Sequence, residues 1–247
     1  MPATASTDFS DPARRIIVAL DVADEQRLIE LVRRLQGAVG LFKVGSELYS
    51  ALGPRAVQLV QEHGGQVFLD LKFHDIPNTV AGAVRTACRL GVSMLTVHAA
   101  GGATMLRAAL DEARDAVGAP LVVGVTVLTS LADADLRAIG LAGPAEQAVL
   151  RLGALAIEQG LDGLVASARE LAALRQAHGN RPYLVTPGIR PAGSDSDDQQ
   201  RVATPGSAVA AGADFLVIGR PITRAPDPAA AAAAIADALV EAEEEDE

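Results

Sequence analysis

The chain has 247 residues and a formal net charge of −10, and six of its acidic residues lie among the last seven. An acidic chain with 3% aromatic residues lacks the positive charge and the stacking platforms of nucleic-acid-binding proteins, so we expect no nucleic-acid partner. Hydrophobic residues make up 49% of the chain, which is enough to bury a sizeable core in one large domain.

The chain has no sequence signal for export or membrane insertion. Cys88 is its single cysteine, so neither an intrachain disulfide nor a cysteine zinc site can form. The first 15 residues contain Asp8 and Asp11 and no apolar stretch typical of a signal peptide. No apolar run reaches the ~18 residues of a membrane span. We therefore expect a cytoplasmic protein with no membrane partner.

Eight short runs rich in Val, Ile and Leu recur along the chain, with helical patterns between them. Such continuous apolarity is typical of parallel strands that are covered on both faces. Amphipathic stretches such as 24–36 and 79–90 have apolar residues at helical spacing. The expected strands are 16–22, 41–46, 66–73, 94–99, 120–128, 163–167, 183–188 and 215–222.

Eight strand–helix units predict an α/β fold, a single-domain (β/α)8 TIM barrel. A doubly wound open sheet is the alternative, but no G-x-G-x-x-G follows the first strand, where the sequence reads ALDVAD. We expect the barrel domain over 14–240, a loose N-terminal tail over 1–13 and an acidic C-terminal tail over 241–247. Asp227 is the expected N-cap of the last helix, with Pro228 in its first turn.

All but two of the 21 basic residues are arginine, and the exceptions are Lys43 and Lys72. Lysine can give up a proton, whereas arginine is effectively always charged. In a TIM barrel the active site lies at the C-terminal ends of the strands. Because both lysines lie in expected strands, they are candidates for proton transfer; the alternative is that they merely escaped a compositional bias.

The third expected strand carries a cluster of charges. Asp70 and Lys72 are two residues apart, so their side chains should share one face. Asp75 follows three residues later, and Lys43 lies on the neighbouring strand. Carboxylates around an ammonium keep the lysine charged and oriented as a proton donor. The alternative is a structural ion-pair network inside the barrel.

The eighth expected strand ends in a pattern typical of phosphate binding. Gly219 and Arg220 end the eighth expected strand, where glycine allows close backbone approach and arginine grips phosphate through two hydrogen bonds. Barrels often bind phosphate with the loops after strands seven and eight. The polar segment 190–201, expected to be a loop that closes over a ligand, supplies Arg190 and Gln199. The alternative is a surface arginine after a turn glycine.

These motifs resemble those of the orotidine 5′-phosphate decarboxylase family, from about residue 14 to residue 228. The string D-L-K-x-H-D-I-P-x-T is the most specific of them. The resemblance implies an enzyme, a carboxy-lyase that converts orotidine 5′-monophosphate to uridine monophosphate and CO2 in de novo pyrimidine biosynthesis, without metal or cofactor. The matching segments are ALDV at 19–22, FKVG at 42–45, FLDLKFHDIPNTV at 68–80, VHAAGG at 97–102, TPGIRP at 186–191 and VIGRPIT at 217–223.

The resemblance assigns roles to the charged cluster. Lys72 matches the lysine that protonates C6 of the pyrimidine after CO2 leaves. Asp70 matches the carboxylate beside the carboxylate of the substrate. Lys43 matches the lysine that links this aspartate to the ribose, and Asp21 matches the ribose-binding aspartate of the first strand.

The resemblance also implies a homodimer with shared active sites, because Asp75 and Thr79 match residues that reach into the neighbouring subunit's site. Thr129 matches the contact to the pyrimidine. Gln199 has Gln200 as an adjacent alternative. The residues that match the phosphate end are Arg190, Gln199, Gly219 and Arg220.

Two other functions remain open to test. Mg²⁺-dependent sugar-phosphate lyases of the same superfamily usually carry an acidic residue on strand two, where this chain has Lys43, which would repel a metal ion. A catalytically silent phosphate-binding barrel would have no reason to keep both lysines. His98 has no second histidine two or four residues away, so the sequence predicts no histidine metal site.

Overall fold

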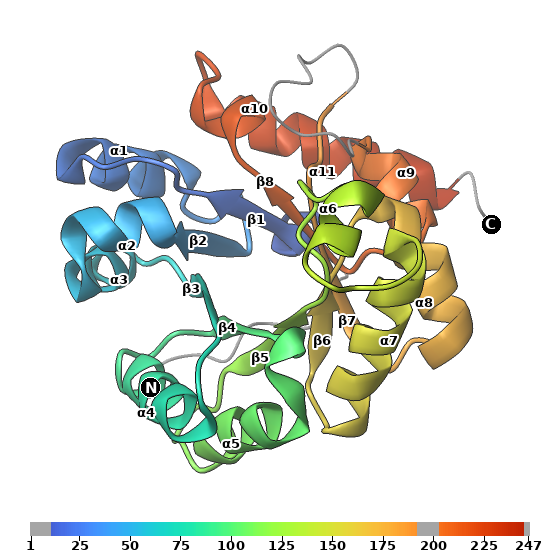
Figure 1. Ribbon diagram of the computed structural model, residues 1–247. Helices are drawn as coiled ribbons and strands as arrows, with labels where there is room; N and C mark the ends of the chain where they lie inside the picture. Colours follow the sequence, from blue (N-terminus) through green and yellow to red (C-terminus); the bar gives the residue numbers. More distant parts are fainter. Residues whose placement is uncertain (1–10, 192–202, 245–247) are drawn as a thin grey trace.

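The computed structural model, which describes residues 11–191 and 203–244, is a closed barrel of parallel strands. The strands follow one another around the barrel in chain order, and the last pairs with the first (Figure 1). This confirms the predicted TIM barrel and excludes the doubly wound sheet. The strands are β1 (Ile16–Ala19), β2 (Leu41–Gly45), β3 (Val67–Phe73), β4 (Met94–His98), β5 (Leu121–Val125), β6 (Gly163–Val165), β7 (Tyr183–Pro187) and β8 (Phe215–Ile218).

Helices surround the barrel and cover the outer face of its strands (Figure 1). None of the helices within the described ranges is long and apolar enough to cross a lipid bilayer. The α-helices are α1 (Glu25–Leu35), α2 (Ser46–Leu52), α3 (Pro54–Glu62), α4 (Pro77–Arg89), α5 (Gly102–Arg114), α6 (Asp133–Ala138), α7 (Ala145–Glu158), α8 (Leu171–His178), α9 (Pro205–Ala210), α10 (Arg220–Thr223) and α11 (Pro228–Glu244). Three short 3-10 helices are η1 (Pro12–Arg15), η2 (Ala99–Gly101) and η3 (Ala168–Glu170).

Side-chain caps fix where several helices begin. The Asp24 side chain accepts a hydrogen bond from the backbone N–H of Arg27 at 2.8 Å and caps α1. Asp227 caps α11 as expected, because its Oδ1 accepts from the N–H of Ala229 at 3.1 Å. Such caps satisfy backbone donors that the first helical turn leaves free. The last helix continues to Glu244, beyond the expected domain boundary at residue 240.

Apolar side chains form two cores. The larger core lies between the strands and the surrounding helices. The smaller one fills the inside of the barrel, and four of its members, Ala19, Phe68, Val185 and Val217, also line the cavity above it. The interior core therefore forms the bottom of the cavity, and the space available to a ligand begins at the C-terminal ends of the strands. The interior residues are Ile17, Ala19, Leu41, Phe68, Met94, Val123, Val185, Phe215 and Val217.

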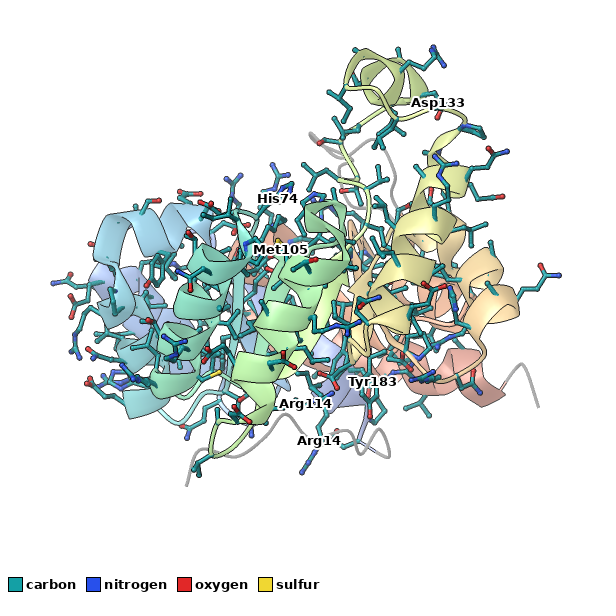
Figure 2. All side chains as sticks on the ribbon, turned by 60° about the horizontal axis from the view of Figure 1, so that its bottom comes forward. Arg14, His74, Met105, Arg114, Asp133 and Tyr183 are labelled. Atoms are coloured by element: carbon teal, nitrogen blue, oxygen red, sulfur yellow. The ribbon has the colours of Figure 1, made fainter. Side chains whose placement is uncertain are left out.

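The two ends of the barrel are separate surfaces. Figure 2 shows His74 and Asp133 at one end, and Arg14, Arg114 and Tyr183 at the other. Because all the strands are parallel, the end that carries His74 collects every C-terminal strand end. We call this end the upper rim and the opposite end the lower rim.

Several strands end earlier than the sequence predicted. The eighth strand, predicted over 215–222, ends at Ile218, because Gly219 leaves the extended conformation with φ −109° and ψ −105°. Arg220 then opens α10, which has a proline in its first turn. Most of the expected loop 190–201, including Gln199, and residues 1–10 of the expected N-terminal tail lie outside the described residues.

Candidate active site

A cavity of about 500 Å³ opens at the upper rim. It brings together eight of the eleven residues that the sequence nominated, from six parts of the barrel. Parallel closure of the barrel is what places them side by side, since they are far apart in the chain. The eight are Asp21, Lys43, Asp70, Lys72, Thr129, Arg190, Gly219 and Arg220.

Four of these side chains form an alternating chain of charges. Lys72 Nζ lies 2.9 Å from both carboxylate oxygens of Asp70. Lys43 Nζ lies 3.8 Å from Asp70 Oδ2 and 3.3 Å from Asp21 Oδ1. The charges alternate in the order Asp21, Lys43, Asp70, Lys72. The two central groups, Lys43 and Asp70, each lie between two charges of opposite sign.

This cluster is poorly suited to a purely stabilising role. The side chains of Lys43 and Asp70 are each only 13% exposed. Removing charges from water costs several kcal/mol per ion, and ion pairing often does no more than offset that cost. A chain of charges that borders an open cavity is instead typical of a binding or catalytic site.

Lys72 has an unusual backbone. Its φ is +50°, and it is the one non-glycine residue with positive φ among the described residues. The register with β4 shifts here, since Leu69 pairs with Leu95 and Phe73 with Val97. β3 therefore bulges, which turns the chain locally. Left-handed backbone at a non-glycine residue costs about 1–3 kcal/mol, and such strain clusters at functional sites.

Glycine at position 45 leaves room for the Lys43 ammonium. A Cβ added at Gly45 would lie 2.8 Å from Lys43 Nζ, which is closer than real Cβ atoms approach another heavy atom. The absence of a side chain at this position lets Lys43 reach both Asp21 and Asp70.

The part of the cavity that follows β7 and β8 is rich in arginine. Arg190 is 8% exposed, and its Nη1 donates to the carbonyl of Ile189 at 3.0 Å. Its backbone N–H donates to the carbonyl of Ala203 at 2.9 Å, which joins the two described ends of the chain around 192–202. Arg220 and Gly219 line the same side, directly after β8. Guanidinium groups in this arrangement suit a phosphate.

Asp75 and Thr79 do not line the cavity. Asp75 follows the end of β3, is exposed, and accepts a hydrogen bond at Oδ1 from the N–H of Ile76 at 2.6 Å. Thr79 is exposed on α4. β3 ends at Phe73, so Asp75 lies beyond the strand and outside the cavity lining of its own chain. The expected roles of Asp75 and Thr79 in a shared site stay predictions.

His98 is a structural residue at the end of β4. Its Nδ1 accepts from the N–H of Ala100 at 3.3 Å, and its ring stacks on His74 with centroids 5.1 Å apart. Burial, the neighbouring His74 and the charge of Lys72 hold the pKa of His98 below its ordinary value. Within residues 11–191 and 203–244, no group of three His, Cys, Asp or Glu side chains is placed to hold a metal ion.

Comparison with known proteins identifies the family. Residues 14–235 match the family model described as orotidine 5′-phosphate decarboxylase / HUMPS family. The chain is similar to the orotidine 5′-phosphate decarboxylase of Moorella thermoacetica, with 57% identity over 228 residues, 90% of each chain. It is also similar to that of Syntrophotalea carbinolica, with 50% identity covering 94% of this chain and 97% of the relative. The chain belongs to the orotidine 5′-phosphate decarboxylase family.

A solved structure supports the same conclusion. The crystal structure of the orotidine 5′-phosphate decarboxylase from Lactobacillus acidophilus is similar, with a TM-score of 0.81 and 36% identity, covering 92% of this chain and 99% of that one. The resemblance inferred from the motifs is confirmed, and the expected carboxy-lyase activity is confirmed at the level of the family. The sugar-phosphate lyase alternative is not favoured by these relatives.

Sequence reasoning did not nominate three cavity-lining residues with charged or hydroxyl side chains: Glu47, Thr223 and Arg224. Thr223 and Arg224 end the segment that begins with Gly219 and Arg220, so the phosphate motif could have been extended to include them. Glu47 follows the FKVG segment by two residues, in the first turn of α2. An exposed glutamate at a helix start has no distinctive sequence signal, because this is a common place for an acidic residue.

Proposed function

We propose that this protein decarboxylates orotidine 5′-monophosphate to uridine monophosphate and CO2 at the upper-rim cavity, as a cytoplasmic enzyme of de novo pyrimidine biosynthesis. The observation that carries the proposal is the alternating charge chain that ends at Lys72 Nζ, 2.9 Å from both oxygens of Asp70. The side chain of Lys72 is 37% exposed toward the cavity it lines, whereas Asp70 is 13% exposed. The ammonium is thus held in place and still accessible to a ligand.

The reaction needs a cation and a proton at one carbon atom. When the bond between C6 and the carboxylate breaks, the electron pair stays on C6 in an orbital without a conjugated sink. The Lys72 ammonium stabilises this developing charge and then transfers its proton to C6. Asp70 orients the ammonium, and its own charge lies beside the departing carboxylate. Solvent returns the proton to Lys72 before the next turnover.

The other residues bind parts of the nucleotide. Asp21 and Lys43 are proposed to bind the ribose hydroxyls, and Thr129 the pyrimidine. The phosphate lies against the arginine-rich side of the cavity, held by Arg190, Gln199, Gly219 and Arg220. A volume of about 500 Å³ falls in the range of small-molecule sites and suits a mononucleotide. Because the phosphate is remote from C6, its binding energy can organise the site for the reaction.

The working unit is proposed to be a homodimer with shared active sites. Asp75 and Thr79 are exposed and do not line the cavity of their own chain. Ile76 lies between them in the sequence and is 67% exposed. Covering the Ile76 side chain would remove apolar surface from water, which favours association. A second copy of the chain would cover Ile76 and receive Asp75 and Thr79 in its own site.

The test is a spectrophotometric assay with orotidine 5′-monophosphate and protein pretreated with EDTA. We expect rapid loss of the substrate absorbance and formation of uridine monophosphate without added metal. Folded, dimeric protein that leaves the substrate unchanged would overturn the proposal. Turnover of sugar phosphates only after Mg²⁺ is restored would instead assign the chain to the metal-dependent lyases, and phosphate binding without any turnover would indicate a silent barrel.

A further inference from the structure

A single buried hydroxyl connects the two residues of the proposed proton-donor pair. Thr96 lies on β4 and is 0% exposed. Its Oγ1 accepts a hydrogen bond from the backbone N–H of Lys72 at 2.8 Å and donates one to Asp70 Oδ1 at 3.1 Å. The one proton of the hydroxyl goes to the carboxylate, and an oxygen lone pair receives the amide proton.

The first of these bonds compensates for the bulge in β3. Four steps along β3, from Leu69 to Phe73, match only two along β4, from Leu95 to Val97. Thr96 is the β4 residue in the middle of this irregular stretch. Its side chain accepts the Lys72 N–H. The left-handed backbone of Lys72, with φ +50°, is therefore held by Thr96.

The second bond fixes the carboxylate that orients the ammonium. Asp70 Oδ1 receives hydrogen bonds from both Thr96 Oγ1 and Lys72 Nζ. Because one hydroxyl bonds the Lys72 backbone and the Asp70 side chain, it sets the position of Nζ from two directions. Thr96 does not line the cavity, so it acts on a ligand only through these two residues.

We propose that Thr96 is a positioning residue for the Asp70–Lys72 pair, a role that rests on the proposed function. It holds the bulged backbone and the carboxylate in the one arrangement that presents the ammonium to C6. The ribose, pyrimidine and phosphate contacts come from other residues. Loss of the hydroxyl should therefore slow the chemical step and leave nucleotide binding nearly unchanged.

The test compares three variants in the decarboxylation assay. Thr96→Val keeps the shape of the side chain and removes the hydroxyl, whereas Thr96→Ser keeps the hydroxyl. Thr126→Val is the matched control, because Thr126 is also a buried threonine, directly after β5, but its hydroxyl donates to the backbone carbonyl of Val165 at 2.8 Å. Thermal unfolding and binding of uridine monophosphate show that each variant is folded.

For Thr96→Val we expect kcat to fall about 10–100-fold with KM changed by less than about threefold, because misplacing a reacting group by about 1 Å can cost 10²-fold. Thr96→Ser should retain kcat within about threefold, and Thr126→Val should lose stability without losing kcat. Wild-type kcat in Thr96→Val, an equal loss in Thr96→Ser, or an equal loss in Thr126→Val would overturn the role.

Two further comparisons keep the test decisive. If Thr96→Val does not fold, Thr96→Cys replaces it, because cysteine is close to threonine in volume and its thiol is only a weak hydrogen-bond donor and acceptor. Loss of kcat in Thr96→Cys but not in Thr96→Ser supports the role, and equal kcat in both overturns it. A wild-type protein without turnover would overturn the proposed function and this role with it, whereas an active wild type with unimpaired Thr96→Val would overturn this role alone.

Discussion

Both rims of the barrel pair aspartates with cations, but the pairs differ in what they bond. At the lower rim, Asp214 Oδ2 accepts from the N–H of Leu184 at 2.7 Å and from Arg175 Nη2 at 2.6 Å. Asp162 makes the same two kinds of hydrogen bond, because it accepts from the N–H of Val122 at 2.8 Å and from Arg114 Nη2 at 2.6 Å. These carboxylates join neighbouring strands through their backbone. At the upper rim the carboxylates bond ammonium groups that border a cavity.

The choice of cation follows the same division. Arg175 also donates to the carbonyls of Gly212 and Pro182, so its planar fork holds several chain segments at once. Such a group fixes structure but cannot release a proton. The two lysines of the chain both lie at the upper rim, where the proposed reaction needs a proton donor. The proposed function would therefore account for lysine at these two positions of an otherwise arginine-rich chain.

The largest effect on catalysis should come from removing the lysine of the Asp70–Lys72 pair at the upper rim. Lys72→Ala removes both the charge that stabilises the electron pair on C6 and the proton that C6 receives. We expect kcat to fall by about 10³-fold or more, with uridine monophosphate still bound within about tenfold of wild type. Kinetics and calorimetry measure the two quantities. A variant that turned over normally, or that bound the product only weakly, would contradict the role of Lys72.

Arg220→Ala should have the second-largest effect, and on binding as well as turnover. A hydrogen bond to a charged group contributes about 1.5–3 kcal/mol, so kcat/KM and the affinity for uridine monophosphate should each fall about 10–100-fold. Uridine is the matched control ligand, since it lacks the phosphate and its binding should not change. Unaltered kinetics in Arg220→Ala would remove this residue from the phosphate site.

The fold was more predictable from the sequence than the details of the site. Eight apolar runs were enough to give the barrel, and two lysines among many arginines marked the charged cluster. The β3 bulge was not predictable, because alternation along a regular strand assumes one conformation for every residue. Thr96 had no signal at all, since a lone threonine in an apolar strand is ordinary and its importance depends on the shifted register of β3.

Breaking a lower-rim pair should change stability instead of chemistry. Asp214→Ala removes the carboxylate that accepts hydrogen bonds from the N–H of Leu184 and from Arg175 Nη2. We expect the free energy of unfolding to fall by about 2–4 kcal/mol, with kcat within about twofold of wild type at a temperature where the variant is folded. Denaturant titration and the decarboxylation assay measure the two effects.

Asp115→Ala is the matched control for that prediction. Asp115 is an exposed aspartate just after α5, and surface substitutions of this kind usually change stability by less than about 0.5 kcal/mol. If Asp214→Ala lost activity in proportion to stability at every temperature, or if Asp115→Ala destabilised the protein equally, the division of labour between the rims would be wrong.

The smallest effect should come from filling the space beside Lys43. In Gly45→Ala the new methyl group would begin 2.8 Å from Nζ, so the flexible lysine must move away. Gly45 has φ −97°, which alanine adopts without strain, so the fold should be intact. We expect KM to rise about 3–10-fold with a smaller change in kcat, because Lys43 is proposed to bind the ribose more than to transfer protons.

Ser46→Ala is the control for this change, because Ser46 is the exposed neighbour of Gly45 and does not line the cavity. Its kinetics should match wild type. If Gly45→Ala lowered kcat as strongly as Lys72→Ala while KM stayed constant, Lys43 would have to be counted with the proton donor, because it would act on Lys72 through their shared neighbour Asp70. Unchanged kinetics would mean that the charge chain tolerates a displaced Lys43, and that the Asp70–Lys72 pair alone distinguishes the upper rim from the lower.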